Sequence, residues 1–266
     1  MDARLPDWKF TARQLEELRR AAGERAKSPL TVDEERLFVR YYLKRIYQMM
    51  YLRGKKAHLA VMYANRFFIK NSLCAVNPRA LIASAIILAC KVTENRLGSI
   101  DYIEKFWCTE RKEIFTVEPV LLEQLRFDIN VQIPHEKFDA ISCMLGQEES
   151  QAFLTKEDWD TAYNILNELT TTDAVLMYSP EEVGTAVFYH IVGKKGEELA
   201  TRFKGAFNEK VAKMSESTEA NIRAIQAIIE NEVLTPFPMD RVTEISNKMI
   251  QSIQPPSKRV KVETHF

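Results

Sequence analysis

Hydrophobic residues recur along most of this chain at intervals of three and four, the spacing that places them on one face of a helix. In the first such segment Leu15 and Leu18 repeat among Arg and Glu residues, and Thr11 precedes them as a candidate N-cap. No segment sustains the alternation with period two that indicates a half-buried strand. The pattern therefore predicts an all-α fold.

The predicted helices form two sets, separated by a short linker at residues 128–134. An N-terminal helix at 11–27 precedes the first set, whose helices lie at residues 31–51, 57–70, 78–94, 99–107 and 112–127. The second set lies at residues 135–145, 156–171, 180–192, 197–206 and 216–233. Ser28-Pro29 marks the end of the N-terminal helix, and Gly54 is expected to close the next one.

A sequence pattern in the first set of helices is repeated in the second set. Asn77-Pro78 and Ser179-Pro180 stand 102 residues apart, and each pairs an N-cap residue with proline at the first helical position. Small residues follow five and six places after each proline, as a helix surrounded by other helices requires. Similarity between any two amphipathic helices is the alternative explanation. The expected domains are an N-terminal helix in 1–30, five-helix units at 31–134 and 135–234, a C-terminal helix at 235–254 and a disordered basic tail at 255–266.

Composition narrows the functions to consider. The 266 residues include 37 Lys+Arg and 37 Asp+Glu, so no net charge draws the protein to nucleic acid or acidic lipid. The longest apolar run, 80–90, is about half of what a membrane helix needs. Four cysteines form no C-x-x-C pair, and Cys74, Cys90 and Cys108 are expected to be buried thiols. We therefore expect no catalytic residue, no metal and no cofactor.

Several motifs carry a family resemblance. Residues 88–94 (LACKVTE), on the helix opened by Asn77-Pro78, resemble the centre of a cyclin box, and Glu118 with Phe127 nine residues later matches the fifth helix of that box. Similarity to the cyclin H subfamily is carried by residues 8–11 (WKFT), 41–46 (YYLKRI), 62–67 (MYANRF) and 172–180 (TDAVLMYSP). The likeness extends from about residue 8 to about residue 252, so it implies two tandem five-helix cyclin boxes.

The resemblance implies a non-enzymatic subunit that binds and activates a cyclin-dependent kinase. The expected setting is a CDK-activating and RNA polymerase II C-terminal-domain kinase complex, with an assembly-factor subunit and the core of transcription factor IIH as further partners. By the same resemblance Lys91 and Glu118 reach the kinase backbone at the start of its C-helix. The alternative is that Lys91 only complements the negative end of its helix while Glu118 is solvated.

Apolar kinase contacts are expected from Val92, Leu122 and Phe127, although each of these residues can equally belong to the core. The first-box helix reads ERLFVRYY at residues 35–42, which departs from the substrate-docking motif of cell-cycle cyclins. This departure favours the transcription-linked branch. Cyclin C or another transcriptional cyclin is the nearest alternative within the family.

A basic segment near the end of the chain suggests location in the nucleus. Lys258, Arg259 and Lys261 follow two prolines and resemble a nuclear localisation sequence, whereas the alternative is an ordinary solvated tail. A competing class is a nucleic-acid binder with the cyclin fold, similar to transcription factor IIB. Such a protein is expected to show a zinc ribbon and a basic face. Neither pattern occurs here, so we expect no direct nucleic-acid binding. The short apolar run noted above leads us to expect no membrane partner either.

Overall fold

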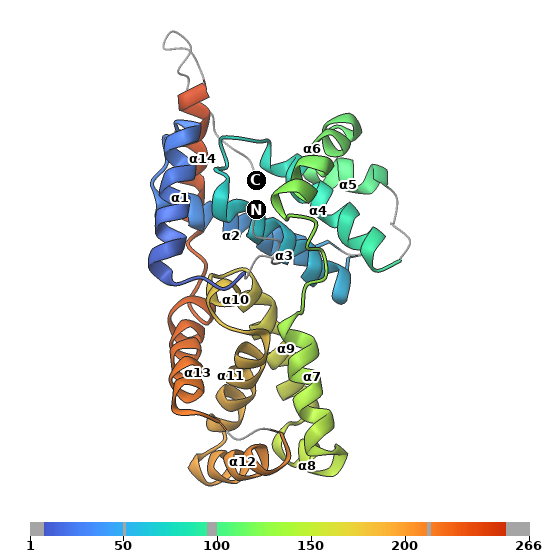
Figure 1. The fold of residues 1–266 in the computed structure, drawn as a ribbon, viewed down its shortest axis with the longest axis vertical. Helices are drawn as coiled ribbons and strands as arrows, with labels where there is room; N and C mark the ends of the chain where they lie inside the picture. The colour runs from blue at the N-terminus through green and yellow to red at the C-terminus, as the bar shows by residue number, and fades with distance from the viewer. Residues whose placement is uncertain (1–7, 50–51, 95–99, 212–213, 254–266) are drawn as a thin grey trace. The chain divides into compact units, whose positions relative to one another are not determined.

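The computed structural model describes residues 8–49, 52–94, 100–211 and 214–253, and its helices are labelled in Figure 1. Within these ranges all regular structure is helical and no strand occurs, which confirms the all-α prediction. Contacts divide the chain into two compact units. Unit 1 combines Met1–Ile129 with Phe237–Phe266, and unit 2 is Asn130–Pro236.

Unit 1 holds helices from both ends of the chain. Its helices are α1 (Ala12–Ala26), α2 (Val32–Tyr47), α3 (Lys55–Lys70), α4 (Pro78–Val92), α5 (Ile100–Trp107), α6 (Arg111–Gln124) and α14 (Met239–Ile253). Helices α3 and α6 pack on α4, α1 packs on α2 and α3, and α14 packs on α2. The two flanking helices expected at the ends of the chain are therefore part of the same compact unit as α2–α6. The expected domain boundaries themselves stay a prediction.

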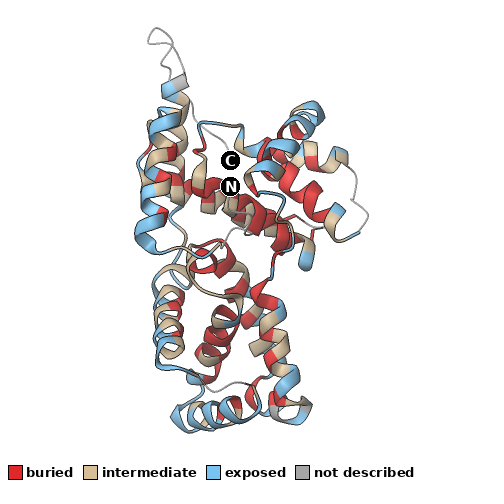
Figure 2. Ribbon diagram, viewed as in Figure 1, coloured by how far each residue is buried: buried red, intermediate tan, exposed pale blue. Residues whose placement is uncertain are grey.

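The centre of unit 1 is α4. The Asn77 side chain accepts a hydrogen bond from the Arg79 backbone N–H at 3.0 Å, and Pro78 occupies the first turn, as predicted. Every residue from Ala80 to Cys90 is buried, so the helix has no solvent-facing side over this stretch (Figure 2). The Ser84 hydroxyl donates to the backbone carbonyl of Ile114 in α6. Small side chains thus let the neighbouring helices approach closely.

Unit 2 repeats this plan. Its helices are α7 (Pro134–Leu145), α8 (Gln147–Phe153), α9 (Lys156–Thr170), α10 (Ala174–Met177), α11 (Pro180–Gly193), α12 (Glu197–Lys210), α13 (Glu216–Ile228) and the π-helical η1 (Ile229–Val233). The central helix is α11, which packs against α7, α9, α12 and α13. Its N-cap Ser179 forms a reciprocal capping box with Glu182, and Pro180 follows. The repeated cap-and-proline start predicted from sequence is confirmed.

Several element boundaries differ from the prediction. Helix α2 ends at Tyr47, and Gly54, with φ 64°, precedes α3 instead of closing α2. The short helices α8 and α10 were not predicted, because four to seven residues are too few for a helical period. The predicted helix at 216–233 changes from α to π hydrogen bonding at Ile229.

The cysteine prediction was correct only for Cys90, which is buried on α4. Cys74 and Cys108 are exposed, because each lies on a connection just before or after a helix. Apolar neighbours in the sequence were therefore a poor guide to burial at these two positions.

Gly184 provides a test of the close packing in unit 2. A Cβ at this position would lie 2.9 Å from the Phe138 backbone N and 3.1 Å from the Pro134 carbonyl oxygen, both on α7. We expect Gly184→Ala to lower the free energy of unfolding by about 1–3 kcal/mol, measured by urea denaturation. Gly205→Ala on α12 is the matched control, because beyond the chain neighbours and the nearby backbone of its own helix no atom lies within 4 Å of the added Cβ. That control should be neutral or up to about 1 kcal/mol stabilising. Equal effects of the two substitutions would contradict close packing at Gly184.

Candidate functional site

The ion pair between Lys91 and Glu118 joins the end of α4 to the middle of α6. Lys91 is the first exposed residue after the buried stretch of α4, and its Nζ donates to Oε1 of Glu118 at 2.6 Å. The Lys91 side chain is 57% exposed, whereas that of Glu118 is 12% exposed. Glu118 is therefore not simply solvated. The carboxylate holds the lysine at the surface while the end of the lysine stays accessible.

Helix α6 places apolar groups beside this pair. Ile114, Val117 and Leu121 recur at helical spacing and are buried against the core. Phe115 and Leu122 lie three residues before and four residues after Glu118, so the three side chains share one face. Phe115 is 45% exposed and Leu122 is half-buried. Phe115 was not among the residues predicted from the sequence, although its spacing from Glu118 could have indicated it.

Phe127 is exposed just beyond the end of α6. Its backbone has φ 58°, the preceding Arg126 has φ 53°, and both values lie in the left-handed region. The Phe127 N–H donates to the Leu122 carbonyl at 2.9 Å, and the Arg126 N–H donates to that of Glu123 at 2.8 Å. The Phe127 side chain is 70% exposed, which excludes the core alternative for this residue.

Val92 and Leu122 are half-buried, so the structure leaves both the core and the surface interpretation open for them. Glu118 and Leu122 lie on α6, and Phe127 follows its end. Lys91 and Val92 are the last two residues of α4, next to α6. The kinase contacts of these five residues stay predictions. Lys258, Arg259 and Lys261, the expected nuclear localisation residues, lie outside the described residues.

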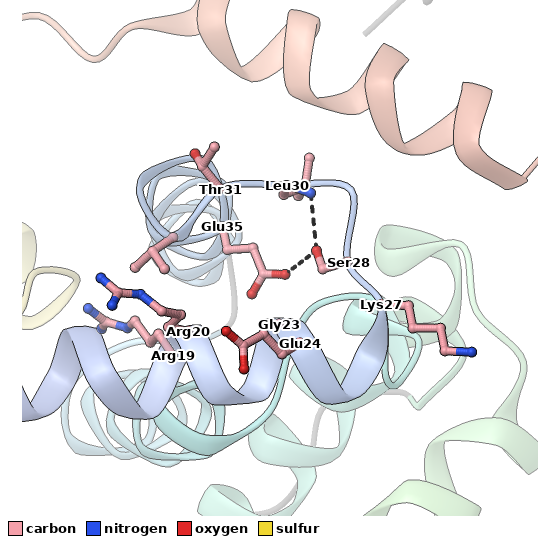
Figure 3. Close-up of a pocket in the computed structure, with 10 residues that line it drawn as sticks. Arg19, Arg20, Gly23, Glu24, Lys27, Ser28, Leu30, Thr31 and Glu35 are labelled. Atoms are coloured by element: carbon pink, nitrogen blue, oxygen red, sulfur yellow. Dashed lines mark hydrogen bonds between the residues drawn. The ribbon is translucent and has the colours of Figure 1, made fainter.

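A charged cavity of about 240 Å³ lies between α1 and the start of α2 (Figure 3). Arg19, Arg20 and Lys27 contribute cationic side chains to its wall, and Glu24 and Glu35 contribute carboxylates. Glu35 is buried and accepts hydrogen bonds from the hydroxyls of Ser28 and Ser72. These bonds tie α2 to the segments that follow α1 and α3, so we interpret Glu35 as a structural residue.

A second cavity, of about 340 Å³, lies in unit 2 and is lined by Tyr189, His190, Lys194 and Glu230 among others. His190 is buried, with its Nδ1 3.6 Å from Oε1 of Glu230. Burial and the nearby Lys194 charge lower the pKa of His190, against the opposing effect of Glu230. The histidine is therefore held in its neutral form.

The described ranges contain neither a metal site nor a membrane-spanning helix. No group of three or more His, Cys, Asp or Glu side chains there is arranged to hold a metal ion. Among the helices of the described ranges, none combines the length and the apolar character needed to span a bilayer.

Comparison with known proteins identifies one domain of the chain. Residues 9–130 match the sequence model of the cyclin N-terminal domain. The chain therefore carries a cyclin N-terminal domain over these residues. The chain is similar to the RNA polymerase II holoenzyme cyclin-like subunit of Aspergillus clavatus, with 28% identity over 71% of this chain and 65% of the relative. Cyclin CCL1 of Saccharomyces cerevisiae is 26% identical over 66% of this chain and 45% of the relative. Cyclin-H of Xenopus laevis is 27% identical over 52% and 44%, respectively.

The chain therefore spans between 44% and 65% of the length of these curated relatives.

Solved structures share the fold. A chain in the structure of the CAK complex from Chaetomium thermophilum bound to ATP-gamma-S gives a TM-score of 0.70 at 21% identity, over 91% of this chain and 85% of that chain. A chain of the yeast TFIIK (Kin28/Ccl1/Tfb3) complex gives 0.65 at 23% identity, over 84% and 96%.

The buried His190 makes stability depend on pH. An unfolded histidine titrates near 6.5, and burial lowers the folded pKa. The unfolded state therefore binds the proton more readily, and the contribution of the neutral histidine to stability is complete above pH 6.5 and is lost as the pH falls below it. We expect the free energy of unfolding to fall between about pH 7.5 and about pH 5.5, and His190→Gln to flatten that slope. The measurement is urea denaturation at several pH values; identical slopes for the two proteins would contradict the assignment.

Proposed function

We propose that this chain is the regulatory subunit of a cyclin-dependent kinase, which it binds and activates through the surface formed by the ends of α4 and α6. The single observation that supports this most strongly is the Lys91–Glu118 pair at 2.6 Å. It presents a cation and a carboxylate together beside apolar groups on α6. Similarity to cyclin H and to cyclins of RNA polymerase II kinase complexes supports the choice of partner.

The mechanism is a shift of the kinase between two conformations. A kinase needs an ion pair between a lysine of its sheet and a glutamate of its C-helix before ATP and Mg²⁺ are correctly placed. A partner that binds the inward position of that helix more tightly shifts the kinase towards it, and equal affinity for both positions would shift nothing. This chain contributes binding energy, and the catalytic groups belong to the kinase.

The chemistry of the surface suits the start of a helix. Free backbone N–H groups at a helix N-terminus donate hydrogen bonds to a carboxylate, and the carbonyl oxygens just before it accept hydrogen bonds from a lysine. Glu118 supplies the carboxylate and Lys91 supplies the cation, and the two side chains lie within hydrogen-bonding distance of each other. Exposed Phe115 and Phe127 on and beside α6 can then bury apolar area around this polar centre.

Further partners follow from the relatives. The yeast TFIIK structure contains Kin28 and Tfb3 together with Ccl1, so we propose that this chain also works with an assembly-factor subunit and the core of transcription factor IIH. The relatives are transcription-associated RNA polymerase II cyclins, which implies action in the nucleus. We propose that the chain enters the nucleus through recognition of Lys258, Arg259 and Lys261 as an import signal. Affinity purification from the native cell, with identification of the bound kinase, tests these partners together.

Reversing the charge of Lys91 tests the polar centre of the surface. We expect Lys91→Glu to weaken kinase binding by about 30-fold or more, because an unpaired charge at a desolvated contact costs about 2–5 kcal/mol. The change should leave the fold intact, since the Lys91 side chain is 57% exposed. The measurement is the dissociation constant and the activation of the purified kinase on repeats of the polymerase C-terminal domain.

Lys112→Glu is the matched control for this charge reversal. Lys112 is an exposed lysine on α6 with the same charge, so this variant changes the net charge equally without touching the ion pair. It should bind and activate nearly as well as the unmodified chain. Full activation by Lys91→Glu, or equal loss in both variants, would remove the support for this surface.

Truncating Phe127 tests the apolar part. We expect Phe127→Ala to weaken kinase binding by about 5- to 30-fold, as loss of a desolvated aromatic contact does at interfaces. The free energy of unfolding should change by less than about 0.5 kcal/mol, because the side chain is 70% exposed and alanine meets the same backbone cost at φ 58°. A large loss of stability with unchanged binding would reverse this assignment.

A further inference from the structure

A cluster of aromatic and charged side chains fixes the N-terminal segment beside the end of α6. The Trp8 indole Nε1 donates to Oδ2 of Asp128 at 2.9 Å. The Arg66 guanidinium of α3 lies 4.8 Å from the centre of the Trp8 ring and 3.4 Å from the same Asp128 oxygen. Trp8, Arg66 and Asp128 therefore form one mutually contacting group, which we call the Trp8 clamp.

The Trp8 clamp is well shielded from water. The side chains of Arg66 and Asp128 are only 10% and 16% exposed. Burial lowers the pKa of Arg66 to about 10, so the guanidinium still carries its charge at neutral pH. The Trp8 donor thus meets a carboxylate in a poorly hydrated place, where a hydrogen bond to a charged group is stronger than at an open surface.

The segment that the Trp8 clamp holds is an unfavourable turn. Arg126 and Phe127 both have positive φ and are not glycine, and each such residue costs about 1–2 kcal/mol. A turn of this kind persists only where its surroundings hold it in place. Asp128 is held by the Trp8 clamp, and the next residue, Ile129, accepts a hydrogen bond from the buried Tyr63 hydroxyl at 2.7 Å. Both anchors lie immediately after Phe127.

We propose that Trp8 is a positioning residue for kinase binding: through Asp128 it holds the turn at 126–128, and thereby the exposed Phe127 side chain, in the orientation that the kinase meets. This inference rests on the proposed function, because it assigns a role to Trp8 in the same surface. Trp8 need not contact the kinase itself. By holding the turn, Trp8 limits the conformations of Phe127 in the free chain. Less conformational entropy is then lost when the kinase binds.

Trp8→Phe tests the clamp with little disturbance, since a phenyl ring can remain over Arg66 while the indole donor is lost. In the free chain we expect faster hydrogen exchange at the amides of residues 126–129, and kinase binding weaker by about three- to tenfold. Tyr163→Phe is the matched control in unit 2, where it removes a hydroxyl that donates to Asp139 at 2.7 Å. That control should change neither exchange at 126–129 nor the dissociation constant.

A double-mutant cycle distinguishes positioning from general stability. If Trp8 acts through Phe127, then Trp8→Phe should weaken binding little further in a chain that already carries Phe127→Ala. Fully additive losses, or unchanged exchange at residues 126–129, would overturn the proposal. If Lys91→Glu weakens binding and Trp8→Phe does not, the positioning role fails while the proposed function stands. If the unmodified chain binds no kinase, the proposed function fails and the positioning role that rests on it fails too, while the exchange measurement still shows whether Trp8 holds the turn.

Discussion

Each unit of this protein depends on one central helix that is buried over most of its length. Burial of every residue from Ala80 to Cys90 requires that neighbouring helices approach α4 on all sides, and large side chains all round would keep them apart. Alanine and serine allow the approach in α4, and Gly184 allows it in α11, where a Cβ would meet the α7 backbone. A proline after an N-cap residue fixes where each central helix begins. The surrounding helices then take their places around it.

The candidate site is a consequence of this constraint. Helix α4 leaves the core between Cys90 and Lys91, so the position of the lysine is set by the packing of the whole helix. An ion pair that is more than half exposed on one side contributes about 0–1 kcal/mol to stability, too little to explain its place by folding alone. The same pair is worth several times more once a partner excludes water from it. The magnitudes therefore favour a binding role.

The sequence was informative wherever the cause was local. Helical spacing, Thr11 as N-cap and the two cap-and-proline starts depend on residues within a turn of each other, and these predictions are confirmed. Lys91 and Glu118 were paired by family resemblance, and the structure places them in contact. The exposure of Phe127 was not predictable, because it follows from two positive φ angles. Neither residue is glycine, the residue that usually marks such a conformation in a sequence. The contact of Trp8 with Asp128 spans 120 residues and leaves no periodic trace.

Long-range contacts of this kind also account for why the ends of the chain belong to unit 1. Lys248 of α14 donates to the Glu34 carboxylate of α2 at 2.7 Å, and against the effect of burial this bond helps to hold the pKa of Glu34 below its usual range. A partner that shifts a kinase from 1:99 to 99:1 must favour one conformation by about 5.5 kcal/mol. A surface that moved could follow the kinase into either conformation and would lose that preference. Under the proposed function, contacts that fix α6 and the turn after it are therefore as necessary to activation as the residues proposed to touch the kinase.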